Sequence, residues 1–159
     1  MEDYHTYFVG SQGLLVHNNC TERMTEFISK VWKAADDDFR NMLKAANGHA
    51  YDDHIGKTLD EIREIADYQG KLCSTFTDEA TALKAIRESL QENAKKVTNW
   101  LDNGAQGELE LIGNHGYDLG FGVRPSSITK IKPLNSSRMY LVKDTTQLSG
   151  FRIKTVFPE

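Results

Sequence analysis

The feature that most constrains the fold is the order in which two hydrophobic periodicities occur along the chain. In residues 21–46, 59–68 and 77–102, apolar side chains recur every three or four positions, which is typical of amphipathic helices. After residue 104 the chain consists of short β-prone runs separated by turns that contain Gly, Asn, Ser or Pro. We expect strands over residues 108–112, 117–123, 128–131, 139–143 and 151–157. Helices first and strands afterwards favour an α+β fold with an antiparallel sheet over an alternating α/β fold.

The helical half also contains predicted boundaries. Thr77 is expected to cap one long helix that runs to about Asp102, with acidic residues in its first turn, where they are favoured. A strand over residues 71–76 precedes it, and residues 49–58 are predicted to form a loop. Asp36, Asp37 and Asp38 point in different directions around a helix, so we interpret them as a solvated face rather than a metal site.

The first twenty residues predict a separate hairpin. Two β-rich runs, Tyr4–Val9 and Leu14–His17, flank a Ser-Gln-Gly turn. So short a hairpin is marginally stable by itself. We therefore expect it to pack on the rest of this chain or on a part of a longer protein.

Length and composition are those of one globular domain with an appendage. The chain has 159 residues, of which 39% are hydrophobic and 26% charged. Its apolar runs are only a few residues long, which predicts no membrane span, and its acidic start is not that of a signal peptide. Cys20 and Cys73 are interpreted as two unrelated thiols rather than a disulfide framework.

The net charge of −4 is unevenly distributed. Residues 121–159 carry seven Lys or Arg and only two acidic residues, whereas residues 1–120 carry twelve Lys or Arg and 21 acidic residues. A basic segment on an acidic protein could face a polyanion or could be scattered surface charge. The acidic remainder argues against tight non-specific binding of nucleic acid.

A short run near the N-terminus resembles a known type of domain. His5–Gly10 (HTYFVG), followed by Leu15–Asn18 (LVHN), resembles the last strands of Hint-type, intein-like autoprocessing domains, which in polymorphic bacterial toxins often precede the toxin. The pair His17 and Asn18 suits the chemistry, because an Asn side chain can attack its own carbonyl while a His assists proton transfer. Residues 1–20 alone are expected to be an inert remnant.

The body of the chain carries a second, longer resemblance. Its motifs occur in this order: Gly48-His49, His54–Thr58 (HIGKT), Ser74–Asp78 (STFTD), Trp100-Leu101 and Gly150–Pro158 (GFRIKTVFP). Together they resemble the bacterial RNase A-like toxin domain found at the C-terminus of contact-dependent growth inhibition proteins. The resemblance covers residues 47–159 and implies a curved antiparallel sheet, leaving residues 21–46 as a helical linker or entry segment.

The resemblance implies a function and its setting. It implies a metal-independent ribonuclease that needs no cofactor and cleaves tRNA or other RNA in a neighbouring cell. The toxin would be secreted or displayed at the cell surface as part of a larger effector, and would act in the cytoplasm of the target bacterium. It would be a monomer that forms a heterodimer with a cognate immunity protein.

The resemblance also implies site residues. In the family the site combines a His of the HxGKT-type loop, an Arg of the following helix and a Thr-x-Tyr pair on the last strand. Carried over, these are His54, Arg63 and Thr155. The aromatic position departs from the pattern, because Phe157 has no hydroxyl. Tyr140 and Tyr117 are candidates to supply that hydroxyl.

These residue types fit RNA cleavage without a metal. The 2′-OH is the nucleophile, and histidine suits either proton-transfer role because its unperturbed pKa lies near neutrality. Arg63 or Lys57 would bind the phosphate, and a threonine hydroxyl would add a hydrogen bond. The second proton-transfer group is not fixed, since His49 and His115 are the other histidines outside the leader. Phe157 is interpreted as a core residue or a surface on which a base stacks.

Three alternatives stay open at this point. Residues His49, Asp52, Asp53 and His54 could hold a divalent metal, although their spacing matches no specific motif. The missing tyrosine hydroxyl could mean a catalytically inactive binding or entry domain. Finally, nothing in the resemblance requires residues 21–46, so deletion of residues 1–46 is expected to leave nuclease activity intact.

Overall fold

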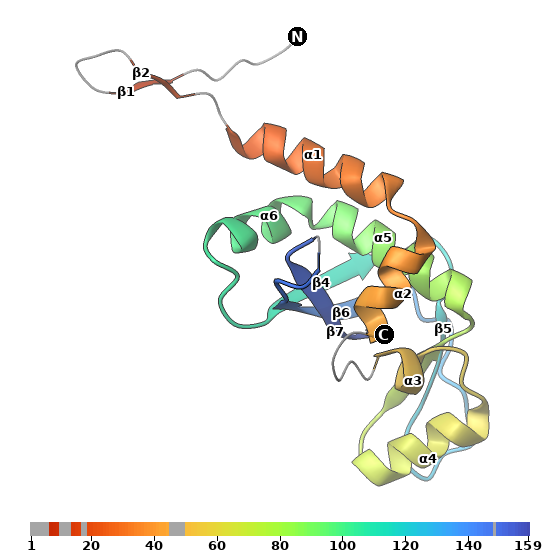
Figure 1. Cartoon of the computed structure of the whole chain (residues 1–159). Helices are drawn as coiled ribbons and strands as arrows, with labels where there is room; N and C mark the ends of the chain where they lie inside the picture. Colours follow the sequence, from red (N-terminus) through yellow and green to blue (C-terminus); the bar gives the residue numbers. More distant parts are fainter. Residues whose placement is uncertain (1–6, 10–13, 17–18, 45–49, 148) are drawn as a thin grey trace.

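The computed structural model describes residues 7–9, 14–16, 19–44, 50–147 and 149–159 (Figure 1). Its elements in chain order are β1 (Tyr7–Val9), β2 (Leu14–Val16), α1 (Asn19–Lys33), α2 (Asp36–Lys44), α3 (Ala50–His54), α4 (Leu59–Gln69), β3 (Cys73–Phe76), α5 (Glu79–Glu92), α6 (Ala94–Asp102), β4 (Leu109–Asn114), β5 (Gly120–Val123), β6 (Ser136–Lys143) and β7 (Phe151–Pro158). Helices precede most of the strands, and every named strand pair is antiparallel, so the expected α+β class is confirmed.

The strands form three separate sheets. The largest has the order β4-β6-β7, the second pairs β3 with β5, and the third is the β1-β2 hairpin. The hairpin pairs Tyr7–Val9 with Leu14–Val16, which confirms its position; the outer ends of the two predicted runs lie outside the described residues. The register breaks between Tyr140 and Leu141 of β6, which makes Lys154 the extra residue of a β-bulge in β7.

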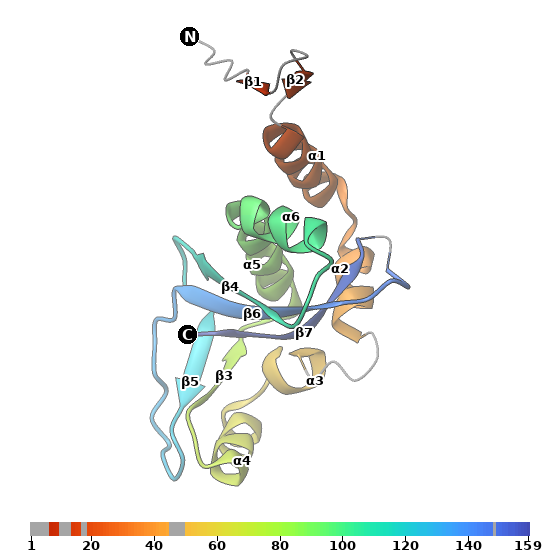
Figure 2. The same ribbon diagram turned by 90° about the vertical axis from the view of Figure 1, so that its left-hand side faces the viewer.

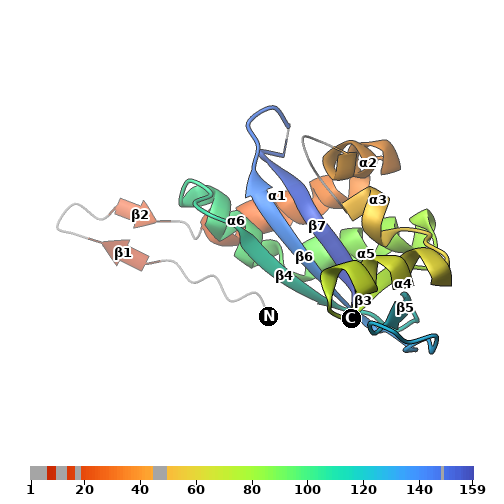
Figure 3. The same cartoon turned by 90° about the horizontal axis from the view of Figure 1, so that it is seen from below.

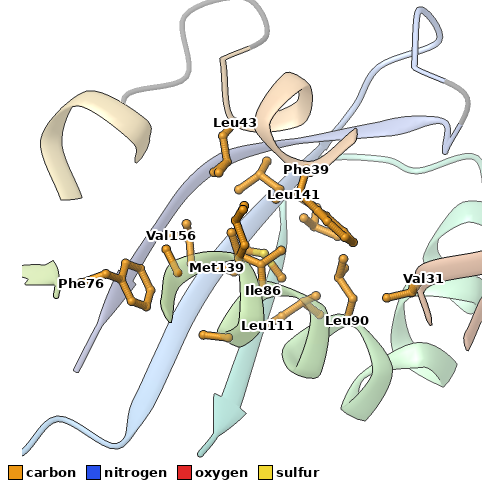
Figure 4. Packing of buried hydrophobic residues seen from close by; sticks show 14 of the residues in the cluster. Val31, Phe39, Leu43, Phe76, Ile86, Leu90, Leu111, Met139, Leu141 and Val156 are labelled. Carbon is orange, nitrogen blue, oxygen red and sulfur yellow. The ribbon is translucent and has the colours of Figure 1, made fainter. Parts of the chain in front are cut away.

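One face of the β4-β6-β7 sheet is covered by helices. Helices α5 and α6 lie on this face, and α1 lies across them (Figure 2). The core between sheet and helices includes Ile86 and Leu90 of α5, and Leu111, Met139 and Leu141 of the sheet, each fully buried (Figure 4). Figure 3 shows the opposite face of the sheet, with the three strands in front of these helices.

A smaller core holds the β3-β5 sheet to α4. Ile62 and Ala66 of α4 pack against Cys73, Phe121 and Val123. Helix α4 matches the predicted helix closely because Thr58 forms a capping box with Glu61 at its start and Gly70, with a φ of +65°, ends it. Cys73 is a buried free thiol.

The predicted helix over residues 21–46 is two helices. Helix α1 ends at Lys33, where the Arg87 guanidinium binds the carbonyls of Val31 and Ala34 at 2.5 and 3.0 Å. Helix α2 then begins at Asp36, and the Asp38 carboxylate accepts the Ala35 N–H at 2.9 Å. The three aspartates therefore open a second helix, where acids are favoured, rather than lying mid-helix.

The predicted long helix over residues 77–102 is also divided. Asp78, not Thr77, is the N-cap, because its carboxylate accepts the Thr81 N–H at 2.8 Å. The break falls at Asn93, whose side-chain amide donates to the carbonyls of Ser89 and Ile112, each at 2.9 Å. The second bond is to β4, so tertiary contact fixes the position of the break.

Two further predictions are corrected. Part of the expected loop at residues 49–58 is the short helix α3 (Ala50–His54). The expected strand over residues 128–131 is absent from the described structure, where only an isolated bridge joins Ile131 to Gly122. No described helix is long and apolar enough to cross a membrane.

Helices α1 and α2 share the main core. Phe39 and Leu43 of α2 are 1% and 0% exposed and lie in the same hydrophobic cluster as the sheet residues (Figure 4). Val31 of α1 belongs to it, and the rings of Phe27 and Phe151 lie 6.4 Å apart. The segment before the motif-bearing body is thus packed onto it.

Candidate active site

The His54 side chain is fixed at the junction of α3 and β3. Its Nδ1 lies 2.8 Å from the carbonyl oxygen of Ser74. Because a carbonyl oxygen only accepts, Nδ1 must carry the proton, and in the neutral imidazole the lone pair is then on Nε2. The ring is partly exposed. This geometry prepares Nε2 to take a proton from a bound hydroxyl group.

The residues after His54 attach this segment to β3. The Gly56 N–H donates to the Phe76 carbonyl at 3.0 Å, and the Lys57 N–H donates to the Thr75 hydroxyl at 3.1 Å. Gly56 has a φ of +65°, a conformation that favours glycine. These contacts explain why the HIGKT sequence forms a rigid support for the histidine.

Phe157 supports the histidine from the last strand. The ring centroids of His54 and Phe157 are 5.5 Å apart, with the planes tilted by 43°. The Ser74 hydroxyl in turn donates to the carbonyl of Pro158 at 2.5 Å, which ties β3 to the end of β7. Phe157 is therefore partly exposed and contacts the imidazole itself.

The open face of the β4-β6-β7 sheet continues from Phe157. Thr155 is the cross-strand partner of Tyr140, and Phe157 is the partner of Arg138. Paired residues on neighbouring strands project from the same face. Because the alternate residues Met139 and Val156 are buried in the core beneath the helices, these four partly exposed side chains lie on the other face of the sheet. The structure thus brings His54, Phe157, Thr155 and Tyr140 to one surface.

Glu110 of β4 organises two groups on this face. Its Oε1 accepts the Tyr140 hydroxyl at 2.7 Å and an Arg138 N–H at 2.5 Å. The Tyr140 hydrogen bond, followed by that of Arg138, lowers the pKa of Glu110, and the bond to Glu110 raises the pKa of Tyr140. Glu159 binds Arg138 at 3.0 Å through both carboxylate oxygens. Tyr140 therefore keeps its proton at neutral pH and is a hydrogen-bond donor.

The two candidate phosphate ligands each pair with an acidic residue of α4. Arg63 pairs with Asp60 at 3.1 Å, and Lys57 Nζ lies 3.8 Å from Glu61. Lys57 is also held by its backbone contact with β3.

His115 lies in a different environment, which removes it from the proton-transfer candidates. Its Nδ1 is 2.7 Å from a Glu88 carboxylate oxygen and its Nε2 is 2.9 Å from the Ser137 hydroxyl, which also contacts Ser89 at 3.0 Å. The His115 side chain is 0% exposed and Ser137 is 1% exposed. The order Ser-His-Glu is that of a hydrolase triad, but no substrate can reach the serine.

Tyr117 belongs to this buried network rather than to the open face. Its hydroxyl donates to Glu88 at 2.8 Å, and Lys84 Nζ lies 3.8 Å from its ring centroid. Burial, followed by the bond to Glu88, raises the Tyr117 pKa well above its usual range. Of the two candidate tyrosines, only Tyr140 is on the surface with Thr155.

The basic C-terminal segment is largely neutralised within the structure. Four of its cations form ion pairs: Lys132 with Asp118, Arg138 with Glu110 and Glu159, Arg152 with Asp144, and Lys154 with Glu108. A fifth, Lys143, donates a hydrogen bond to the Gly104 carbonyl. Lys130 lies over the Phe121 ring at 4.2 Å. The uneven charge seen in the sequence thus does not amount to a uniformly basic surface.

Several candidate residues fall outside the described residues. These are His17 and Asn18 of the leader, and His49 before α3. Among the residues that the structure does describe, no three or more His, Cys, Asp or Glu side chains are grouped so that they could hold a metal ion.

Sequence reasoning missed the residues that position the histidine. Ser74 lies in the STFTD motif, but its carbonyl contact with His54 depends on the pairing of distant segments. The Tyr51 hydroxyl donates to Glu79 at 2.5 Å, and Glu110 gathers Tyr140 and Arg138. Only Glu79 carried a local signal, as an acid in a first helical turn.

Comparison with known proteins places this architecture in a family. The model of the bacterial CdiA-CT RNase A domain matches residues 48–158. Among solved structures, a chain of the CdiA-CT/CdiI complex from Y. kristensenii is similar, with a TM-score of 0.62 and 27% identity over 70% of this chain and 99% of that chain. No curated protein matches significantly. Because the family model spans most of the sequence, including His54 and the last strand, the chain belongs to the bacterial CdiA-CT RNase A domain family.

Proposed function

We propose that this chain is a toxin that cleaves tRNA or another RNA in a target bacterium, without a metal ion, by transphosphorylation at the 2′-OH. The observation that carries this proposal is the placement of His54. Its tautomer is set by the Ser74 carbonyl, and it stands beside a sheet face that carries hydroxyl donors. Histidine suits the role of general base because the ordinary pKa of its side chain lies near neutrality.

The reaction assigns a role to each group. His54 Nε2 accepts the 2′-OH proton, the 2′-oxygen forms a bond to phosphorus, and the P–O5′ bond breaks with protonation of the 5′-oxygen. This leaves a 2′,3′-cyclic phosphate and a 5′-OH. Thr155 donates a hydrogen bond to a non-bridging oxygen. Tyr140, its cross-strand partner, would supply the hydroxyl that Phe157 lacks by turning its O–H from Glu110 to the substrate. Lys57 or Arg63 would provide the cation for the phosphate.

The second proton-transfer residue is proposed by position in the sequence. His115 is enclosed by Glu88 and Ser137. His49 immediately precedes α3, the helix that ends in His54. We assign the protonation of the 5′-oxygen to His49, and His49→Ala should therefore lower the rate for an ordinary RNA. The loss should shrink for a substrate whose leaving group needs no proton.

The proposed setting includes an inhibitor. The similar solved chain comes from a CdiA-CT/CdiI complex, which supports a cognate immunity protein that binds this domain as a one-to-one partner. The larger effector would be secreted or displayed at the cell surface, and the RNA would be cut in the cytoplasm of the recipient. The His17-Asn18 pair would be the remnant of an autoprocessing domain.

Expression in cells that lack an immunity protein tests the function. The chain should arrest growth and fragment tRNA, and His54→Ala should do neither, whereas the exposed control Lys30→Ala should behave as wild type. Cleavage by the purified protein should persist in excess chelator. Loss of cleavage in chelator would favour a metal-dependent nuclease, and RNA binding without cleavage or growth arrest would favour an inactive binding domain.

A further inference from the structure

The Glu79 carboxylate links helix α2 to helix α3, which carries His54. Glu79, the first residue of α5, accepts the Tyr51 hydroxyl through Oε2 at 2.5 Å. Its Oε1 accepts N–H groups of Arg40 on α2, with N–O distances of 2.6 Å. A second contact reinforces the first, because Lys44 Nζ lies 4.3 Å from the centroid of the Tyr51 ring. Two residues of α2 thus converge on Tyr51.

Tyr51 is well placed to set the direction of α3. It lies three residues before His54, so the two side chains are neighbours one turn apart on a five-residue helix. A helix this short is not stable by itself. Its orientation is therefore determined by contacts at its two ends, with Glu79 and Lys44 at Tyr51, and with Ser74 and Phe157 at His54.

Helix α2 is itself firmly held. Phe39 and Leu43 are buried in the main core, and Arg87 of α5 lies 4.6 Å from the Phe39 ring centroid while binding the end of α1. The family match begins at residue 48, after α2. The contacts to Tyr51 are therefore made by a segment that precedes the matched domain.

We propose that α2 is a positioning element of the nuclease site, in which Arg40 and Lys44 hold Tyr51 and thereby set the His54 imidazole against Ser74 and Phe157. This inference rests on the proposed function only for its catalytic consequence. It replaces the expectation that residues 21–46 are dispensable for activity. Arg40, Lys44 and Tyr51 are positioning residues and take no part in proton transfer.

Kinetics separate positioning from general stabilisation. At a temperature well below unfolding, Tyr51→Phe and Arg40→Gln should lower kcat for RNA cleavage on the order of tenfold to a hundredfold, because small displacements of a reacting group are costly. KM should change little, since neither residue binds RNA. Arg40→Lys should restore part of kcat. The control is Arg23→Ala on α1, which removes an ion pair with Asp102 far from Tyr51 and should leave kcat unchanged.

The effect should also depend on His54. In a His54→Ala background, Tyr51→Phe should not lower the residual rate further, because both changes act through the same imidazole. An equal further loss would show that Tyr51 acts elsewhere. A fall in the unfolding temperature with kcat unchanged would likewise contradict the proposal and would leave α2 as a structural support only.

Nuclear magnetic resonance of the full chain tests the inference without relying on activity. The His54 ring resonances should shift or broaden in Tyr51→Phe and in Arg40→Gln, and those of His115 should stay in place. Unchanged His54 resonances in both folded variants would overturn the proposal, whatever the nuclease assay shows. If the resonances move as expected but wild-type protein cleaves no RNA, the positioning role stands and the proposed function fails.

Discussion

Two histidines of this chain occupy opposite kinds of environment. His54 is partly exposed, has one ring nitrogen on a backbone carbonyl and lies against an aromatic ring beside an open sheet face. His115 is enclosed, with one nitrogen on Glu88 and the other on Ser137. His115 is therefore the weaker candidate for catalysis, although its contacts with Ser137 and Glu88 resemble a catalytic triad. Access of a substrate, rather than the number of hydrogen bonds, distinguishes the catalytic candidate.

The largest expected effect is at His54. Replacing it with Ala removes the proposed general base, which should lower the rate of RNA cleavage by about 10²- to 10⁴-fold. Its hydrogen bond to the Ser74 carbonyl is near the surface, so the unfolding temperature should change little. Single-turnover cleavage and thermal unfolding of the same preparation measure both quantities. A His54→Ala protein with wild-type activity would show that His54 is not the general base.

The next effect is expected at Thr155, on the open sheet face beside His54. Thr155→Val keeps the shape of the side chain and removes the hydroxyl. Hydrogen bonds to charged groups contribute about 1.5–3 kcal/mol, so kcat should fall about tenfold to a hundredfold. Thr129→Val in the exposed loop after β5 is the matched control. Equal rates for the two variants would remove Thr155 from the site.

At His115 the expected loss is of stability rather than rate. His115→Ala removes one hydrogen-bond partner from Glu88 and one from Ser137, which costs about 1–3 kcal/mol of unfolding free energy. For a chain of this size that corresponds to a decrease in Tm of about 2–4 °C per kcal/mol. Denaturant unfolding provides the measurement. The folded variant should keep its kcat, and a catalytic loss without a stability loss would reverse the assignment.

The smallest expected effect is on the pH dependence of stability, through Glu110. The Tyr140 and Arg138 contacts lower the pKa of Glu110 below the ordinary value of 4.5. Its stabilising contribution is thus present above about pH 4.5 and is lost as the pH falls through the lower folded-state pKa. Wild-type protein should lose more stability than Glu110→Gln between pH 5 and pH 3. Glu22→Gln on α1 is the control. Parallel pH profiles for wild type and Glu110→Gln would show that the contacts of Glu110 with Tyr140 and Arg138 contribute nothing to stability.

Local signals in the sequence account for much of the fold. Apolar periodicity predicted the helix over residues 59–68, which is α4, and the β-prone run over residues 151–157 predicted β7. The helix breaks at residues 34–35 and at Asn93 were not predictable in this way. Arg87 and the Ile112 carbonyl, both distant in sequence, fix them. Periodicity continues across such breaks because both helices face the same core.

The candidate site likewise has features that the sequence indicated and others that depend on contacts between distant segments. The resemblance led to His54, Thr155 and the departure at Phe157, and the structure brings these three together. It did not indicate that Phe157 contacts the imidazole, or that Tyr140 pairs with Thr155. Both facts depend on strand register and on the approach of α3 to β7. Nor did the resemblance indicate that Arg63 pairs with Asp60 of its own helix at 3.1 Å.

The most direct test of the account is the chemistry of the cleaved ends. Wild-type protein incubated with total tRNA in excess chelator should produce fragments that end in a 2′,3′-cyclic phosphate and begin with a 5′-OH. His54→Ala should produce neither, while His115→Ala, kept below its unfolding temperature, should produce both. Fragments with 5′-phosphate and 3′-OH ends, or cleavage that stops in chelator, would contradict the account.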